Sequence, residues 1–228
     1  MFLGHFAVAY AAKRVAPRTS LGTLFIAVQW ADLLWPALVL LGIEHVAIAP
    51  GDTAATPLQF VSYPFTHSLL ADLAWGLILG GLYYGVRRYR AGAIVVGLGV
   101  LSHWVLDVIV HRADMPVLFS GPKVGFGLWN APMVEMLLEL AMFAVGLALY
   151  LRTTRPADRT GRYATWALAA VLLVSYLSSA FGPPPPSVAT IAWVGLVAGW
   201  FTVLWAYWAD GHRVAPAEPP ARVRVISP

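Results

Sequence analysis

The hydrophobic positions of this chain gather into long runs, whereas a half-buried strand or helix would show regular alternation. A helix needs about 20 mostly apolar residues to cross the hydrocarbon of a bilayer. Six runs are long enough, with short polar, glycine-containing or proline-containing breaks between them: about 20–43, 66–86, 91–111, 128–151, 163–181 and 187–209. The pattern predicts an all-α polytopic membrane protein, a bundle of about six transmembrane helices.

Two terminal segments fall outside these runs. The apolar stretch 2–12 is too short to span a bilayer, and its charges, Lys13 and Arg14, follow it, unlike those of a signal peptide. We expect a short N-terminal helix, at the inner interface or part-way into the bundle. The proline-rich segment 213–228 predicts a disordered cytoplasmic tail, which leaves 1–212 as a single membrane-embedded helical domain.

Composition supports this assignment. The chain of 228 residues is 59% hydrophobic and 11% charged, against roughly 25% charged residues in a soluble domain. It has no cysteine, so disulfides and thiolate metal ligands are excluded. Its net charge of +4 comes from cations in short breaks between apolar runs, which favours membrane lipids as partners and no nucleic acid.

The basic residues also predict an orientation. If the six runs cross in alternation, thirteen of the 15 Lys and Arg residues fall on one side, and only Arg112 and Lys123 fall on the other. Cytoplasmic loops carry the excess of Lys and Arg. We therefore expect a multi-pass protein of the inner (plasma) membrane, with both termini in the cytoplasm.

Ionisable residues occur within the apolar runs, where a charge at a helix centre costs about 2.5–3.5 kcal/mol. They are Asp32, His67, Asp72, His103, Asp107, His111, Glu135 and Glu139, with His5 in the N-terminal stretch. His103, Asp107 and His111 stand four residues apart and so share one helix face. We expect such groups to face inward and to meet partners, water or a cation.

The depths of these residues agree between runs. At about 1.5 Å per residue, His103 and Asp107 lie roughly 18 and 24 Å above the inner end of their helix, and Glu135 lies roughly 10 Å below the outer surface. His67 is near the outer end of its run, and Asp32 is near mid-depth. This agreement predicts one shared site in the outer half of the membrane.

The residue types indicate a metal centre. Histidines and carboxylates without thiols suit zinc, manganese or iron, and Zn²⁺ is the first choice. A bound metal lowers the pKa of its water to about 7 and so supplies a hydroxide nucleophile. We expect Asp32, His67, His103 and Asp107 to hold the metal, Asp107 thereby taking part in catalysis, and Glu135 to act as general base or extra ligand.

Simpler explanations exist for individual residues. A single histidine in a membrane helix is more often hydrogen-bonded to a neighbouring helix than bound to metal. His111 is explained equally well as an interface residue beside Arg112. Asp72 points partly away from His67, which favours a structural role, and Glu139 is explained as a buried partner of a histidine.

The segments GHFAVAYAAKR, QWADLLWP, YPFTHSLL and LSHWVLDVIVH resemble the bacterial membrane-bound metal-dependent hydrolase family, over roughly residues 1 to 140. This family is also described as LexA-binding and inner-membrane-associated, and it is distantly similar to zinc-dependent phospholipase C. The resemblance implies zinc ligands at the matching positions, which are His5, Asp32, His67 within Thr66–Ser68, His103 and Asp107.

The chain departs from the family pattern in two places. Many members have Pro-Asp-x-Asp in the first long helix, where residues 31–34 here keep only the carboxylate of Asp32. Many have Arg-Gly before the Thr-His-Ser, where this chain has Pro64 and Phe65. The second carboxylate of a multi-metal site and a phosphate-binding arginine are therefore missing from these positions.

Three functions fit these observations. The first is a membrane-embedded metal-dependent hydrolase; the resemblance implies a lipid or other phosphoester as substrate. The second is a transporter or ion conduit, because intramembrane histidines and carboxylates also mark ion paths. The third is a structural protein whose polar cluster joins helices, although interhelical polar contacts contribute only about 0.6 kcal/mol each.

Overall fold

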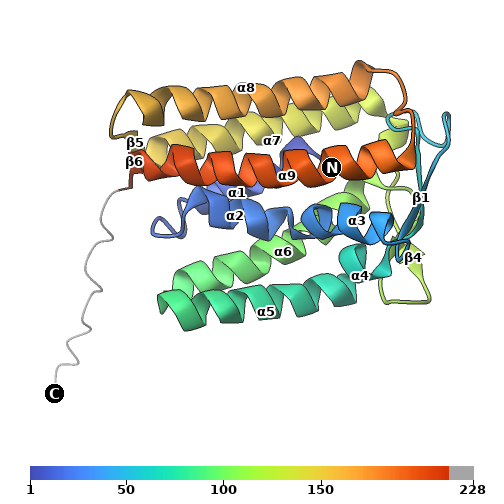
Figure 1. Ribbon diagram of the computed structural model, residues 1–228, viewed down its shortest axis with the longest axis horizontal. Coiled ribbons are helices and arrows are strands. Elements are labelled where there is room, and N and C mark those ends of the chain that lie inside the picture. The colour runs from blue at the N-terminus through green and yellow to red at the C-terminus, as the bar shows by residue number, and fades with distance from the viewer. Residues whose placement is uncertain (216–228) are drawn as a thin grey trace.

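A computed structural model describes residues 1–215 as an elongated bundle of helices lying side by side (Figure 1). The α-helices are α1 (Leu3–Ala12), α2 (Leu21–Val28), α3 (Trp30–Leu40), α4 (Pro64–His67), α5 (Leu69–Arg87), α6 (Arg90–Val110), α7 (Pro132–Thr153), α8 (Arg159–Phe181) and α9 (Val188–Gly211), with a 3₁₀ turn at Leu128–Asn130. The helices α5 to α9 are each long and apolar enough to cross a membrane. The protein is therefore an all-α polytopic membrane protein.

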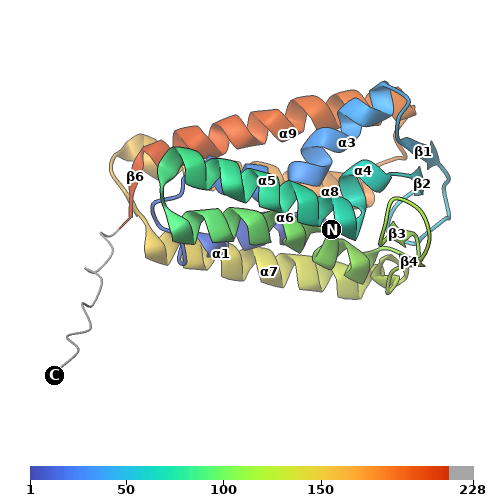
Figure 2. The ribbon, with the colours of Figure 1, turned by 90° about the horizontal axis from the view of Figure 1, so that it is seen from below.

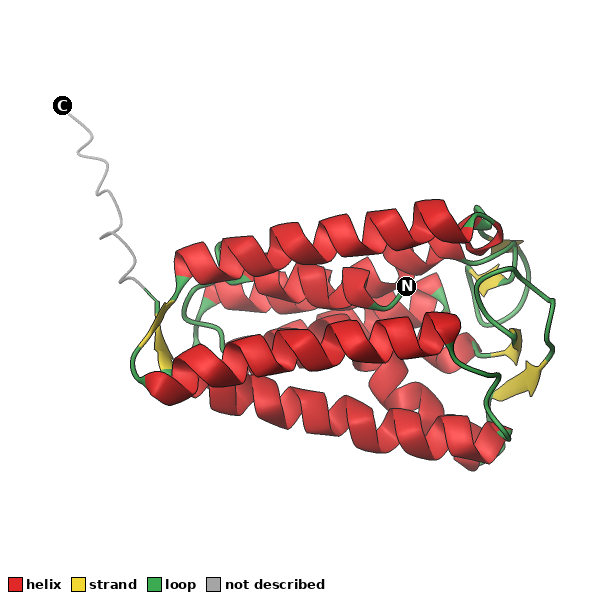
Figure 3. Ribbon diagram, turned by 90° about the horizontal axis from the view of Figure 1, so that it is seen from above, coloured by secondary structure: helices red, strands yellow, loops and turns green. Residues whose placement is uncertain are grey.

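Short antiparallel strand pairs close the two ends of the bundle (Figure 3). At one end β1 (His45–Ile48) pairs with β2 (Leu58–Ser62), and β3 (Met115–Pro116) pairs with β4 (Lys123–Val124). At the opposite end β5 (Arg155–Pro156) pairs with β6 (Arg213–Val214). The segment expected as a tail thus begins with two paired residues, and residues 216–228 of it lie outside the described residues.

The first predicted span is broken. α2 and α3 meet at an angle of 57°, and Gln29 between them departs from helical geometry, with φ −109° and ψ 10°. The pair counts as a sixth span only when the two halves are taken together. The run 20–43 is therefore a broken span and not one continuous helix, and the break places Asp32 in the first turn of a new helix.

The N-terminal helix α1 lies inside the bundle. Leu3, Ala9 and Tyr10 are fully buried, and α1 packs against α7, α2 and α6. A helix that is apolar on all sides needs such surroundings. Gly146 of α7 permits the closest approach, because a side chain there would overlap the carbonyl oxygen of Ala7.

Helices α5 and α6 form an antiparallel hairpin along one side of the bundle (Figure 2). The turn between them holds Arg88 in the left-handed region, with φ 49°. Ser68 begins α5 as an N-cap, its side chain accepting a hydrogen bond from the Ala71 backbone N–H. This cap directly follows His67, the last residue of α4, and so fixes the backbone on the C-terminal side of that histidine.

Candidate metal centre

Helix α6 supplies two adjacent groups of the candidate site. His103 and Asp107 are separated by one helical turn and are 0% and 3% exposed. His111 follows as the C-cap of the same helix and is also buried. The four-residue spacing therefore places all three side chains on the inward face, as the sequence predicts.

The structure brings together all five residues that the sequence predicts as metal ligands. His5 from α1, Asp32 from α3 and His67 from α4 meet His103 and Asp107 of α6. One group of three ligand atoms comes from His5, His103 and Asp107, and a second comes from Asp32, His67 and His103. Within each group the atoms lie within 4.8 Å of one another, and His103 belongs to both groups.

The spacing of these atoms suits a small divalent cation. His67 Nε2 and Asp32 Oδ1 are 3.3 Å apart, and His103 Nε2 and Asp107 Oδ2 are also 3.3 Å apart. Two further separations are 3.8 Å from His103 to Asp32 and 4.0 Å from His67 to Asp107. Ligand atoms on a tetrahedral zinc ion, with bonds of about 2.0–2.2 Å, are about 3.3–3.6 Å apart.

The break between α2 and α3 fixes the tautomer of His103. The last carbonyl of α2, at Val28, lies outside the hydrogen-bond ladder of α3, whose first bond runs from Leu33 N–H to Gln29. His103 Nδ1 donates to that Val28 carbonyl at 2.7 Å. A carbonyl can only accept, so in a neutral ring the proton is on Nδ1 and Nε2 carries a lone pair.

His67 is oriented through a hydroxyl. Thr66 Oγ1 donates its one proton to Glu44 Oε2 at 2.6 Å and therefore accepts from His67 Nδ1 at 2.7 Å. Glu44 is held in turn by the backbone N–H groups of Phe65 and Thr66. The neutral His67 ring consequently also presents the lone pair of Nε2 to the cluster.

In this arrangement a histidine lone pair faces a carboxylate oxygen, so two hydrogen-bond acceptors lie side by side. His103 Nε2 is buried and makes no hydrogen bond to any described residue, although a carboxylate oxygen lies 3.3 Å away. A lone pair and a carboxylate oxygen at this distance repel each other unless a cation, or an added proton on the ring, lies between them. The donor set therefore fits a divalent metal.

Asp107 is the most connected carboxylate of the cluster. Its Oδ1 accepts from His5 Nε2 at 3.0 Å and from the Met1 amine at 2.5 Å. The His5 ring stacks on His103, with the ring centroids 3.9 Å apart. His5 Nδ1 is buried without a hydrogen-bond partner in the described chain.

The cluster is accessible at one member. The Asp32 side chain is 43% exposed, whereas those of His67 and Asp107 are each 4% exposed. Asp32 lies in the first turn of α3, where a carboxylate is favoured by the helix dipole. A small molecule would therefore approach the cluster from the Asp32 side.

His111 adds a sixth polar group to the cluster. Its Nδ1 donates to Asp114 Oδ1 at 3.0 Å, which leaves Nε2 facing Asp107 Oδ2 at 4.0 Å. Burial lowers the pKa of His111, and the hydrogen bond to Asp114 only partly offsets this effect. The neutral ring is enclosed by Trp129 and Phe60, at centroid distances of 4.1 and 4.8 Å.

Asp114 links this histidine to the protein surface. Burial alone would raise the pKa of Asp114, but the hydrogen bonds from His111 and Arg112 outweigh it and lower that pKa. Arg112 donates to Asp114 at 3.1 Å and to Asp52 at 2.6 Å. These contacts tie the loop after α6 to the loop of the β1–β2 hairpin.

The two glutamates of α7 belong to neither group of ligand atoms and have other hydrogen-bond partners. Glu135 accepts a hydrogen bond from the Tyr176 hydroxyl at 2.8 Å, and no hydrogen bond or ion pair within residues 1–215 joins it to the five predicted ligands. Glu139 accepts from the backbone N–H groups of Phe2 and Gly4 and so caps α1. Glu139 thus serves the helix, and a role for Glu135 as general base stays a prediction.

Asp72 is buried at the start of α5. Its carboxyl group is 0% exposed, and neither oxygen has a hydrogen-bond partner among the described residues. Its backbone N–H bonds to the Ser68 carbonyl in the first turn of the helix. Asp72 lines the groove between α5 and α6 and belongs to neither ligand group.

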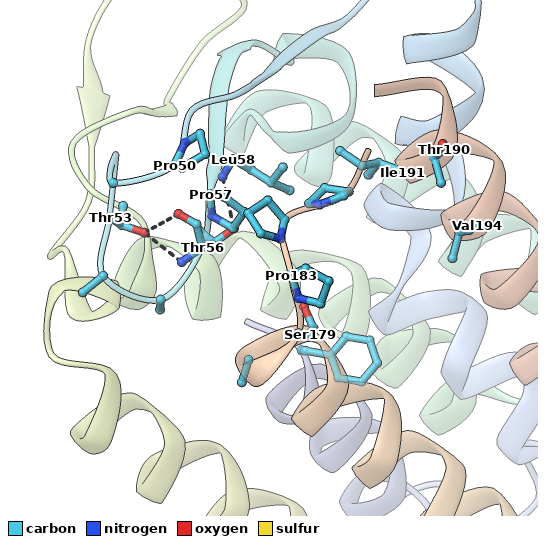
Figure 4. A pocket seen from close by; sticks show the side chains of 18 of the residues that line it. Pro50, Thr53, Thr56, Pro57, Leu58, Ser179, Pro183, Thr190, Ile191 and Val194 are labelled. Atoms are coloured by element: carbon cyan, nitrogen blue, oxygen red, sulfur yellow. Dashed lines mark hydrogen bonds between the residues drawn. The ribbon is translucent and has the colours of Figure 1, made fainter. Parts of the chain in front are cut away.

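A recess of about 600 Å³ opens beside the β1–β2 hairpin (Figure 4). The loop 50–58, the polyproline turn and the start of α9 line it, together with Phe2. Thr53 holds the loop by accepting from the Thr56 backbone N–H and donating to the Thr56 carbonyl, each at 3.0 Å. Phe2, which lines the recess, follows Met1, whose amine donates to Asp107 of the cluster.

Sequence reasoning missed the groups that hold the ligands in place. Glu44 and Asp114 lie in polar breaks and resemble ordinary loop residues. The acid three residues after His111 could have been noted as its partner, whereas nothing near Glu44 in the sequence indicates Thr66. The Val28 carbonyl is a backbone group, so no residue type in the sequence indicates it.

Comparisons with known proteins give no identification. No family model, curated protein or solved structure matches the chain. The resemblance to the membrane-bound metal-dependent hydrolases therefore stays a prediction, carried by the motifs alone.

Proposed function

We propose that this protein is a membrane-embedded, metal-dependent hydrolase. His5, Asp32, His67, His103 and Asp107 would hold a divalent metal, with Zn²⁺ the first choice. The observation that carries the proposal is the shared orientation of His67 and His103. Each has its Nδ1 proton held by a separate partner, and each turns its Nε2 lone pair toward a carboxylate. Such outer partners are typical of histidines that bind metal.

The residues around the cluster have distinct roles in this proposal. A divalent metal would act as a Lewis acid and activate water for attack at neutral pH. His111 Nε2, fixed by Asp114, is oriented to accept a hydrogen bond from a water near Asp107. Asp32 forms the accessible side, through which the scissile group would enter.

A lipid or other phosphoester is the proposed substrate class. The motif resemblance supports it, and so does the place of the cluster. His103 and Asp107 lie toward the C-terminal end of α6, which is long and apolar enough to cross the membrane and is followed by β3. The distribution of basic residues supports an inner-membrane protein with both termini cytoplasmic, which would turn that end outward.

Hydrolysis of a chromogenic phosphodiester by the detergent-purified protein tests the proposal. Activity should disappear after treatment with a chelator and return with Zn²⁺. His103→Ala should abolish it, because that residue belongs to both ligand groups. His45→Ala is the matched control, since His45 is exposed on β1 and should leave the activity unchanged.

Two results would count against the hydrolase. One is phosphodiester turnover that survives the chelator and His103→Ala alike. The other is a protein that binds zinc at the cluster but cleaves neither the chromogenic diester nor phospholipids in mixed micelles. The second result would leave the metal centre in place and remove the hydrolytic role.

A further inference from the structure

The α5–α6 hairpin carries a groove on the outside of the bundle, with a volume of about 700 Å³. Its floor is backbone, because Gly76 and Gly80 of α5 pack directly on α6. A Cβ at Gly76 would lie 2.8 Å from the carbonyl oxygen of Gly97, and one at Gly80 would lie 2.9 Å from that of Ala93. With no side chains between the helices at these levels, a narrow channel follows the helix axes.

The walls of the groove are apolar. Leu73 and Leu77 of α5 are 43% and 78% exposed, and Ile94 and Leu98 of α6 are 52% and 60% exposed. Both helices are long and apolar enough to span a membrane, so these side chains face hydrocarbon. A flexible, linear, apolar group is the shape that such a channel accepts.

One end of the groove is strongly basic. Arg90 and Tyr84 line it there, and Arg88 lies in the turn between the helices, whereas the neighbouring Arg87 lines a separate recess with Arg18 and Tyr83. The Arg88 guanidinium lies 5.9 Å from the centre of the Tyr84 ring. Among the described residues that line the groove, Asp72 is the one acid, and it stands 15 residues before Arg87, about 22 Å away along α5.

We propose that this groove binds one anionic phospholipid, with an acyl chain along the glycine floor and the phosphate against the arginine turn. Guanidinium groups bind phosphate through charge-assisted hydrogen bonds, and basic residues at a membrane surface attract anionic lipid. The site lies apart from the metal cluster and does not depend on the proposed hydrolase.

Charge also decides between a lipid and a second copy of the chain. Two copies in one membrane share their orientation, so pairing through this face would bring two arginine turns to the same depth. Like charges at that position repel each other, whereas an anionic headgroup neutralises them. The charge pattern therefore favours the lipid.

Native mass spectrometry of the detergent-purified protein tests the site, with phosphatidylglycerol and phosphatidylcholine of identical chains as probes. The wild type should retain one phosphatidylglycerol, bound about ten-fold or more tightly than phosphatidylcholine. Arg90→Gln should weaken phosphatidylglycerol binding by about five-fold and leave phosphatidylcholine unchanged.

A pair of glycine variants tests the groove itself. Gly81 lines it, and Gly211 ends α9 elsewhere; a Cβ added at either position meets no described atom within 4 Å, so both substitutions fit the fold. Gly81→Phe should abolish retention of the lipid, and Gly211→Phe should preserve it.

Three outcomes would overturn the proposal. The first is equal affinity of the wild type for the two lipids, and the second is equal retention by Gly81→Phe and Gly211→Phe. The third is a dimer of the wild type that Gly81→Phe dissociates, which would assign the groove to a second copy.

Discussion

The hydroxyl of Thr66 decides which nitrogen of His67 carries the proton. It has one hydrogen to donate, Glu44 takes it, and His67 Nδ1–H must then be the donor to the hydroxyl oxygen. His103 reaches the same state through the Val28 carbonyl. At the scale of single residues, the candidate site is thus a set of lone pairs that separate partners hold toward one centre.

Removing that hydroxyl should weaken metal binding without unfolding the protein. Thr66→Val keeps the shape of the side chain and frees the His67 ring to change tautomer. Loss of such an outer partner typically lowers metal affinity by about 10- to 100-fold. Competition with a chromogenic zinc chelator measures the change.

Thr66→Ser is the control, because it keeps the hydroxyl and should retain nearly the full affinity. If Thr66→Val and Thr66→Ser bound zinc equally, the hydroxyl would have no part in orienting His67.

The sequence predicted some of these residues and missed others for identifiable reasons. The spacing of His103, Asp107 and His111 predicted one shared face, and all three are buried there. Depth along the membrane predicted that Glu135 joins them. Depth does not define direction around the bundle, and Glu135 is hydrogen-bonded to Tyr176 of α8, so its role beside the cluster stays a prediction.

At the scale of elements, the packing of α1 on α7 positions His5. Gly146 leaves room for the Ala7 backbone, and Glu139 accepts from the first N–H groups of α1. Helix α1 has only 10 residues, which is too short for a stable isolated helix, so packing against the surrounding helices stabilises it.

Gly146→Ala should destabilise the protein by about 1–3 kcal/mol, because overpacking a close backbone contact forces the helices apart. Gly85→Ala is the opposite case, since a Cβ there meets no atom of residues 1–215 within 4 Å. It should stabilise α5 by roughly 0.5–1 kcal/mol. Thermal unfolding in detergent compares the two, and equal effects would refute the close contact of α1 with α7.

The N-cap of α8 should give a pH-dependent contribution to stability. Asp158 accepts from Gly161 N–H and from His212 Nδ1, and these hydrogen bonds lower the pKa of Asp158 from its ordinary value of 3.8. A lowered folded-state pKa means that the charge stabilises the fold above pH 3.8 and that this stabilisation is lost as pH falls through the lowered pKa.

The difference in melting temperature between the wild type and Asp158→Asn should therefore be constant near neutral pH and should shrink in acid. A difference that grows as pH falls would contradict this sign.

The elements also show what hydropathy can and cannot define. Long apolar runs predicted α5 to α9, because crossing a bilayer requires that length. The same averaging concealed the 57° bend at Gln29, since both halves of the span are equally apolar. That bend exposes the Val28 carbonyl, so the feature that hydropathy misses is the one that orients His103.

At the scale of the whole molecule, the two ends of the bundle differ in charge and in covering. One end carries the β5–β6 pair and the arginine turn of α5–α6, and the other carries the two hairpins beside the cluster. The positive-inside rule predicts that the arginine-rich end faces the cytoplasm.

Cysteine labelling tests this orientation directly, because the chain has no cysteine of its own. Ser120→Cys, near the cluster end, should react with a membrane-impermeant maleimide on intact spheroplasts. Arg159→Cys, at the start of α8, should react only after permeabilisation. The reverse pattern would invert the proposed orientation.

The central claim is that a metal ion compensates the imidazoles and carboxylates that meet inside the bundle. The most direct test is the metal content of the purified protein, joined to X-ray absorption at the metal edge. We predict near-stoichiometric zinc with nitrogen and oxygen ligands at about 2.0–2.2 Å, lost in His103→Ala with Asp107→Ala and kept in His45→Ala. Wild-type protein that is metal-free, and whose melting temperature is unchanged by added zinc, would contradict it.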